Sequence, residues 1–288
     1  MSIVKGLVAL VLLVALGLGA YVAGAWRGLY GEHEGPGTIS GKRVAASAIE
    51  ARTLAQARAA KSITEKQPKQ ILFGDLHVHT TFSTDAFLWS LPMMQGDGAH
   101  PIADACDYAR FCSALDFWSI TDHAEASTPR RWRETRDTMR QCNALAGDAN
   151  NPDIAVFLGF EWSQVGRTPE DHYGHKNVIF HGLADNEVTA RPIGASGIAT
   201  DGLRSAVGQM SPFTGFEDFA RRQRYYNFVE FMREVTAVPL CPAGNSRELS
   251  PDCYESAATP ADLFAKLDQW GVDTMVIPHG NTWGYYSP

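Results

Sequence analysis

Basic residues are too few and too scattered in this sequence to form a long positive stripe. Lys and Arg number 25 against 32 for Asp and Glu, which gives a formal net charge of -7 at pH 7. Domains that bind nucleic acid usually cluster Lys and Arg on one face, so this composition argues against a nucleic-acid partner. The chain also lacks an internal repeat and a low-complexity tract, and its 288 residues suit one large domain or two small ones.

Cysteine is scarce as well, and none of the five cysteines lies near the N-terminus, so a lipid-modified N-terminal cysteine is not supported. Cys241 and Cys253 flank a loop of Pro, Gly, Asn and Ser that has no apolar core of its own, and a disulfide would staple this loop. Cys142 can pair with Cys106 or with Cys112, which leaves one thiol over. Free buried thiols are the alternative for these three residues.

An apolar run from Gly6 to Trp26 contains no charge and lies between Lys5 and Arg27. Such a run is typical of an export signal or an N-terminal anchor. Ala23-Gly24-Ala25 offers a small-x-small cleavage site, while the whole run is long enough to span a bilayer with its lysine inside. A buried core helix is disfavoured because every face is apolar. We therefore expect residues 1–27 to be a signal peptide or a membrane anchor, and the domain to be periplasmic or extracellular, possibly tethered.

Helical and extended segments alternate along the rest of the chain. Residues 28–70 are expected to form a Gly-rich linker and an Ala-rich helix over residues 44–60. Further helices are predicted over residues 102–114, 129–145, 213–234 and 260–271, the last capped by Thr259. Predicted strands begin with residues 71–73 and continue with 115–120, 154–160, 177–180 and 275–277. This order favours an α/β fold with a mostly parallel sheet.

Four of the apolar runs end in residues that can bind metal. The residues at or just after these ends are His77, His79, Asp85, Asp122, His123, Glu161 and His279. An α/β barrel builds its site on one face in this way, from the C-terminal ends of its strands. The pattern therefore predicts a metal centre.

The spacing of these residues indicates how they could act. His77 and His79 project from the same side of a strand, because side chains alternate with a period of two, and Asp85 can return a carboxylate to them. In Asp122-His123 one residue can bind metal while the other orients it. Glu161 can bridge two cations. Nitrogen and oxygen ligands without thiolate favour Zn, Mn or Fe, and two such ions about 3.5–4 Å apart would activate a water and clamp an anionic ester oxygen.

Other polar residues allow two interpretations. Among His172, His175 and His181, position alone favours His181, which ends a predicted strand. His100 is expected at the surface or as a helix cap. Four arginines could meet an anionic substrate or simply be solvated: Arg110, Arg131, Arg133 and Arg191.

The motifs, in this order, resemble the PHP superfamily, named for polymerase and histidinol phosphatase. They are His77-Val78-His79 with Asp85, Thr121-Asp122-His123, Gly159-Phe160-Glu161 and Pro278-His279. Residues 74–80, 160–163, 174–180 and 277–281 are closer still to an exported branch known as domain of unknown function 3604. The resemblance covers roughly residue 71 to the C-terminus.

This resemblance implies a distorted (β/α)7 barrel that holds two or three divalent cations, usually Zn, Mn or Fe. It assigns His77, His79 and Glu161 to one cation. It assigns Glu161, His175 and His279 to a second, and Asp85 and His123 to a third, so that His175 replaces His181. The superfamily's last motif, an Asp-x-His pair, has no counterpart after His279. We therefore expect residues 71–288 to be the N-terminal portion of an incomplete barrel.

The expected function is that of an exported metal-dependent hydrolase acting on a small anionic ester. A phosphomonoester or phosphodiester is the first expectation, with a metal-bound hydroxide as the nucleophile and with Glu161 and Asp122 as catalytic residues. Sulfate ester hydrolysis is an alternative, because two cations clamp its oxygens in a similar way. A non-catalytic metal-binding module is a second alternative.

Overall fold

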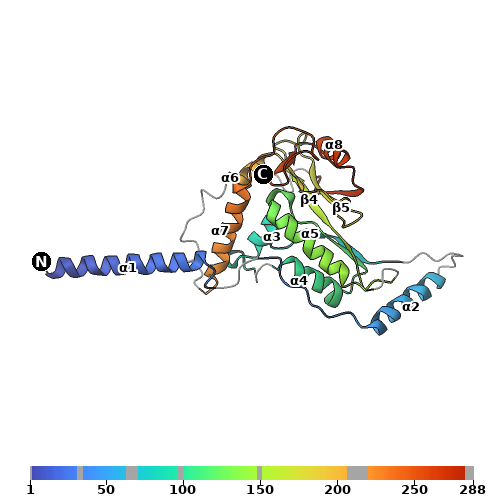
Figure 1. Cartoon of the computed structure of the whole chain (residues 1–288), viewed down its shortest axis with the longest axis horizontal. Helices are drawn as coiled ribbons and strands as arrows, with labels where there is room; N and C mark the ends of the chain where they lie inside the picture. Colours follow the sequence, from blue (N-terminus) through green and yellow to red (C-terminus); the bar gives the residue numbers. More distant parts are fainter. Residues whose placement is uncertain are drawn as a thin grey trace.

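The structure is a computed structural model, and it describes residues 2–30, 35–62, 71–96, 100–147, 151–205 and 220–282. Within these ranges the fold is mixed α/β (Figure 1). Its α-helices are α1 (Ser2–Trp26), α2 (Ala46–Ser62), α3 (Thr84–Trp89), α4 (Ile102–Asp107), α5 (Pro129–Ala144), α6 (Ile198–Ser205), α7 (Arg222–Ala237) and α8 (Pro260–Trp270). Its strands are β1 (Gly74–Val78), β2 (Phe117–Ile120), β3 (Ala155–Phe157), β4 (Gly159–Gln164), β5 (Gly174–Phe180), β6 (Ile193–Ala195), β7 (Glu255–Ala257) and β8 (Thr274–His279).

The described strands form three sheets, and none of them closes into a barrel. β1, β2 and β3 pair in parallel, and so do β6 and β7. β4, β5 and β8 form an antiparallel sheet, so the prediction of a mostly parallel sheet is wrong for this part of the fold. A single bridge between His123 and Glu161 joins the end of β2 to β4, where the Glu161 N–H donates to the Asp122 carbonyl at 3.1 Å.

The predicted strand over residues 154–160 is divided between two sheets. β3 pairs with β2, whereas β4 pairs with β5, and Leu158 lies between them. Gly159 allows this passage, because a Cβ there would lie 2.6 Å from the Val178 carbonyl oxygen and 2.9 Å from that of Ile120. Consequently Glu161 is the third residue of β4 rather than the end of a single long strand.

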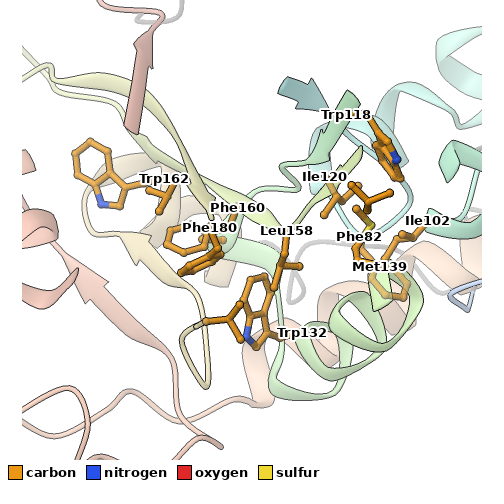
Figure 2. Close-up of a cluster of buried hydrophobic side chains, with 14 of the residues drawn as sticks. Phe82, Ile102, Trp118, Ile120, Trp132, Met139, Leu158, Phe160, Trp162 and Phe180 are labelled. Atoms are coloured by element: carbon orange, nitrogen blue, oxygen red, sulfur yellow. The ribbon is translucent and has the colours of Figure 1, made fainter. Parts of the chain in front are cut away.

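The hydrophobic core lies between the sheets and helices α4 and α5 (Figure 2). Trp118 on β2, Trp132 on α5 and Trp162 on β4 are almost completely buried, as are Phe160 and Phe180. The Trp132 ring meets the Phe160 ring edge-on with centroids 6.0 Å apart. These large rings fix the positions of β2, β4 and β5, the strands that carry several of the predicted ligands.

Most predicted helices are present, and the predicted cap at Thr259 is confirmed. Thr128 caps α5, and Thr259 caps α8 in a reciprocal pair with Asp262. α8 ends at Gly271, whose φ of 61° suits glycine. The helix predicted over residues 102–114 begins as α4 and continues as a π-helical turn, Tyr108–Cys112.

Two predicted boundaries need correction. Ile71-Leu72-Phe73 does not belong to a strand, because the first strand begins at Gly74 and the three apolar side chains before it are exposed. The helix predicted over residues 213–234 is α7, which begins at Arg222; residues 213–219 lie outside the described part of the chain.

Two disulfides settle the pairing that the sequence left open. Cys241 pairs with Cys253, as predicted, and Cys106 pairs with Cys142, which joins α4 to α5. Cys112 is the leftover thiol, and it is exposed.

Candidate metal centre

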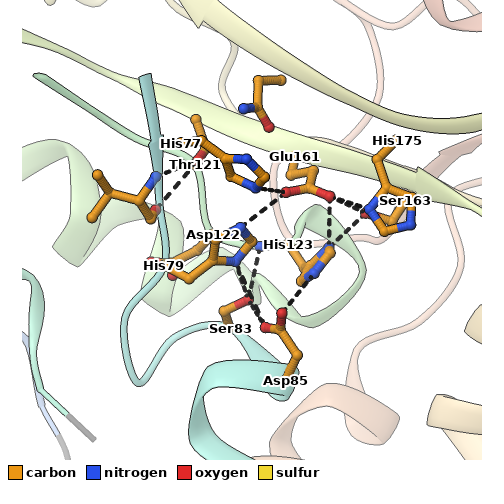
Figure 3. Close-up of polar contacts among 12 residues, drawn as sticks. His77, His79, Ser83, Asp85, Thr121, Asp122, His123, Glu161, Ser163 and His175 are labelled. Carbon is orange, nitrogen blue, oxygen red and sulfur yellow. Dashed lines mark hydrogen bonds and ion pairs between the residues drawn. The ribbon is translucent and has the colours of Figure 1, made fainter. Parts of the chain in front are cut away.

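The predicted ligands come from β1, β4, β5 and β8, from helix α3 and from the segments after β1 and β2, yet they meet at one edge of the sheets (Figure 3). β4 and β8 both run antiparallel to β5. Their C-terminal ends therefore lie beside the beginning of β5, where His175 pairs with Ser163 of β4 and with His279 of β8. His181, at the other end of β5, lies away from this edge and beside Asp273, whose carbonyl accepts its backbone N–H.

Glu161 lies at the centre of the cluster, with a side chain that is 1% exposed. Its Oε2 atom is 2.9 Å from Nε2 of His77 and 2.9 Å from Nε2 of His79. Its Oε1 atom contacts Nδ1 of His175 and lies 3.2 Å from Nε2 of His279. Each oxygen thus has two imidazole nitrogens within 3.2 Å, which is the arrangement expected of a bridging carboxylate.

This environment keeps Glu161 ionised. Burial alone would raise the pKa of the Glu161 carboxyl, because it penalises the charged form. Close contacts with the imidazoles of His175, His279, His77 and His79 outweigh the burial and hold the pKa of Glu161 far below its usual range. The carboxylate is therefore available as an anion at any physiological pH.

A second group of contacts surrounds Asp85 and His123. Nε2 of His123 is 3.2 Å from Oδ2 of Asp85, and Nδ1 of His79 is 3.6 Å from Oδ1. Burial alone would lower the pKa of His123, but the Asp85 hydrogen bond and the charge of Glu161 raise it to about 9. Burial would raise the pKa of Asp85, whereas the hydrogen bond and charge of His123 bring it well below its usual range. The two residues therefore attract each other strongly when no cation is bound.

Asp122 does not enter the cluster. Its two carboxylate oxygens accept hydrogen bonds from the backbone N–H and the hydroxyl of Thr80, at 2.6 and 2.7 Å. Burial raises the pKa of Asp122. Because Thr80 directly follows His79, these bonds fix the end of β1 and so the direction of that imidazole. Of the two roles open to Asp122-His123, the structure places His123 among the ligand candidates and Asp122 behind them.

Three sets of donor atoms lie close enough to hold an ion. In each set the atoms are within 4.8 Å of one another, and the sets are His77–His79–Glu161, His79–Asp85–His123 and Glu161–His175–His279. Two of these sets have the same members as the first and second sets implied by the resemblance, and His79 joins the Asp85–His123 pair in the third.

The donor atoms fit a cation better than they fit one another. Both ring nitrogens of His279 are buried and make no hydrogen bond with any described residue, although Nε2 lies 3.2 Å from Glu161. The 3.2 Å contact lacks hydrogen-bond geometry and is an electrostatic contact only. The rings of His77 and His279 have centroids 4.4 Å apart, and those of His79 and His123 are 4.8 Å apart. A cation would satisfy these crowded nitrogens, which is consistent with Zn, Mn or Fe.

Three polar residues support the cluster, and sequence reasoning missed two of them, Ser163 and Glu125. Ser83 Oγ contacts Nδ1 of His79 at 2.8 Å, and Ser163 Oγ contacts Nδ1 of His123 at 2.6 Å. Oε1 of Glu125 accepts the backbone N–H groups of Ser163 and Ala195, while Oε2 is buried without a hydrogen bond from the described residues and lies 3.8 Å from Nδ1 of His123. Only the proximity of Glu125 to the Asp122-His123 motif could have suggested it.

The remaining predicted residues lie away from the cluster. His172 is held by the Gly166 N–H and the Gly280 carbonyl, and His100 is at the surface beside Asp104, as expected. The four arginines form ion pairs elsewhere: Arg110 with Asp153, Arg131 with Glu234, Arg133 with Asp252 and Arg191 with Glu255. The first, second and fourth are buried, so the solvated alternative is also wrong for them.

Comparison with known families gives one match. A family model described as "Protein of unknown function (DUF3604)" matches residues 66–145. This stretch contains His77, His79, Asp85 and the Asp122-His123 motif, and it ends before Glu161. No curated protein and no solved structure matches the chain.

Proposed function

We propose that this protein is an exported metal-dependent hydrolase of small anionic esters, with a phosphate ester as the first substrate class. The observation that carries the proposal is that Glu161 joins two of the three sets of nitrogen and oxygen donors. Two ions that share a carboxylate are the usual basis of metal-assisted hydrolysis of phosphate esters. The same donor sets support the finer proposal that the domain is related to the PHP superfamily and to its distorted (β/α)7 barrel fold.

Different residues of the cluster would hold the cations, orient the ligands and leave the site open to the substrate. Divalent cations, when bound, would supply a Lewis acid that activates a water and neutralises charge on the ester oxygens. Glu161 is a member of two donor sets and so brings them together. Asp85 and His123 form the third set with His79. Ser83, Ser163 and Asp122 orient the imidazoles from behind. The side chains of His77 and Asp85 are 45% and 46% exposed, so the mouth of the cluster is open to a small molecule.

The export part of the proposal depends on two further observations. Ile3–Trp26 is long and apolar enough to cross a membrane. Two disulfides are formed in the described part of the chain, and such bonds persist mainly in oxidising compartments.

The decisive experiment measures turnover by the purified full chain with Zn, Mn or Fe. The substrates are p-nitrophenyl phosphate, bis-p-nitrophenyl phosphate and p-nitrophenyl sulfate, and the Glu161→Gln variant is the matched control. We expect hydrolysis of a phosphate ester that a chelator abolishes and that added metal restores. Turnover of the sulfate alone would reassign the substrate class. Bound metal with no turnover of any ester would contradict the hydrolase proposal and favour a metal-binding module.

A further inference from the structure

Helix α1 consists of two parts with different surroundings. Every residue from Ile3 to Ala20 is exposed, whereas Gly24 and Ala25 are buried against the domain. Figure 1 shows the helix projecting alone from the body and meeting α7 only near its C-terminal end. The change from exposed to buried takes place within about one and a half turns.

The exposed part has the length and composition of a membrane span. At about 1.5 Å per residue, Ile3–Ala20 is about 27 Å long, close to the hydrocarbon thickness of a bilayer of about 30 Å. Lys5 is its only charged side chain and lies near the end of the span, where a lysine can reach the interface. The mean hydropathy of the helix is 2.5, so a lipid bilayer is the partner that suits this surface.

The buried part is joined to α7 by specific polar contacts. Nε2 of Gln223 donates to the Ala25 carbonyl at 2.8 Å, and the Tyr30 N–H donates to Oε1 of the same glutamine at 3.3 Å. The guanidinium of Arg233 lies 4.1 Å from the centre of the Trp26 ring. Gln223 is 4% exposed. Outside its own helix, the oxygen and the nitrogen of its side-chain amide both find their partners in the N-terminal segment.

Gly24 makes this junction possible. The chain turns after Trp26, and the Tyr30 ring folds back over the helix to stack on Tyr21, with centroids 5.4 Å apart. A Cβ at Gly24 would lie 2.5 Å from the Tyr30 hydroxyl. A larger residue at this position would therefore displace the Tyr30 ring.

We propose that α1 is a retained membrane anchor and that its last turns are a structural part of the domain. Tyr21, Trp26 and Tyr30 then lie at the membrane interface, where aromatic rings are favoured. Cleavage after Ala25 would remove the carbonyl to which Gln223 donates, and it would leave that buried amide without this partner. This inference does not depend on the proposed hydrolase activity.

α7 also connects the anchor to the metal centre. The Phe87 ring of α3 meets the rings of Phe228 and Phe231 on α7 edge-on, with centroids 5.2 and 5.3 Å apart. α3 carries Asp85, one of the candidate ligands. The anchor thus supports the helix on which the ligand side chain sits, through α7.

The first test asks whether the N-terminus is retained. Wild type and Ala23→Leu, both with a C-terminal tag, are expressed with export, and membranes are extracted with alkaline carbonate before intact-mass measurement. Ala23→Leu removes a small residue that signal cleavage requires. We expect both proteins to stay in the membrane with residues 3–25 present. A soluble wild-type chain that begins at Trp26, together with a membrane-bound Ala23→Leu chain, would overturn the proposal.

The second test asks whether the junction stabilises the domain. Gly24→Leu leaves both small residues of the cleavage motif in place but displaces Tyr30, whereas Gly19→Leu makes the same change where a Cβ meets nothing within 4 Å. In detergent-solubilised full chain, we expect Gly24→Leu to lower the Tm by at least about 2–4 °C, and Gly19→Leu to leave it unchanged. Equal Tm values for both variants and wild type would show that the last turns are not part of the domain.

Discussion

At the scale of single residues, the proposed chemistry depends most on Glu161. Glu161→Gln nearly preserves the shape of the side chain but removes the negative charge that would offset the repulsion between two cations. Two ions that lack this bridge repel each other. We therefore expect the purified full chain to lose at least one metal ion and to lose activity by more than about 100-fold. Elemental analysis beside wild type measures the metal, and ester hydrolysis measures the activity.

Glu170→Gln is the matched control, because it makes the same change at an exposed glutamate. Two outcomes of the Glu161→Gln experiment would count against the bridge. Equal metal content and equal activity would show that Glu161 is not a ligand. Lost stability with unchanged metal content would instead indicate a buried ion-pair role.

Glu125 provides a second prediction at this scale. Its Oε2 atom lies 3.8 Å from Nδ1 of His123, whereas Asp85 contacts the other ring nitrogen, Nε2. Glu125→Gln keeps one oxygen acceptor for the N–H groups of Ser163 and Ala195 but removes the charge behind the imidazole. We expect the affinity for one metal ion to fall by about 10–100-fold while the circular dichroism spectrum stays that of wild type. Competition with a chelating dye measures the affinity, and an unchanged value would show that Glu125 serves only the backbone.

The residues that touch one another in the cluster were largely predictable, and the residues behind them were not. His77, His79 and Asp85 follow each other closely, so local geometry alone brings them together. His175 was reached only through a family resemblance, because position along the chain favoured His181. Ser163 and Glu125 come from a neighbouring strand and turn, and their contacts appear only once β4 is placed beside β2.

At the scale of elements, the direction of β5 explains the largest difference between sequence and structure. A rule for parallel strands predicts ligands at C-terminal ends, and it holds for His123 and His279. β5 runs the other way, so its ligand lies near its beginning. The sequence of β5 carries no local signal of its direction, because a strand buried on both faces is a short apolar run whether it is parallel or antiparallel. The Gly159 break was more visible, since glycine within an apolar run often marks a close backbone approach.

A partly buried charge cluster between α5 and α7 gives a prediction at this scale. Glu234 on α7 accepts hydrogen bonds from the Thr128 cap of α5 and from Arg130 and Arg131. Burial alone would raise the pKa of Glu234, but these partners lower it. Glu234→Gln leaves the buried Arg131 without its partner carboxylate. We expect a loss of about 1–3 kcal/mol in the free energy of unfolding. This is less than the loss of a fully buried ion pair would cost, because Glu234 is partly exposed.

The effect should depend on pH in a defined direction. A carboxyl whose pKa is lowered on folding stabilises the native state above its unfolded value, about 4.3, and the contribution is lost as pH falls through the folded pKa. The difference between wild type and Glu234→Gln should therefore be constant near neutral pH and shrink below about pH 4. Urea unfolding at several pH values measures it, with Glu134→Gln as the control, because Glu134 pairs with the exposed Arg130 and not with the buried Arg131. A difference that grows in acid would contradict this assignment.

At the scale of the whole molecule, the candidate metal centre requires two of the three described sheets to be held together. β1 and β2 belong to one sheet, while β4, β5 and β8 belong to another, and the two meet through the His123–Glu161 bridge. Anything that holds the two halves together therefore also holds the ligand sets together. The disulfide between Cys106 and Cys142 contributes by fixing α4 to α5 across the core.

That disulfide gives the last prediction, which also tests export. It closes a loop of 36 residues, for which restriction of the unfolded chain is worth about 4 kcal/mol. We expect Cys142→Ala to lower the Tm by about 8 °C or more, while Cys112→Ala, which removes an exposed free thiol, leaves it within about 1 °C. In exported wild type unfolded without a reductant, only Cys112 should react with iodoacetamide. Labelling of Cys106 and Cys142 as well would show that these thiols are free in the cell, and the oxidising location would lose its support.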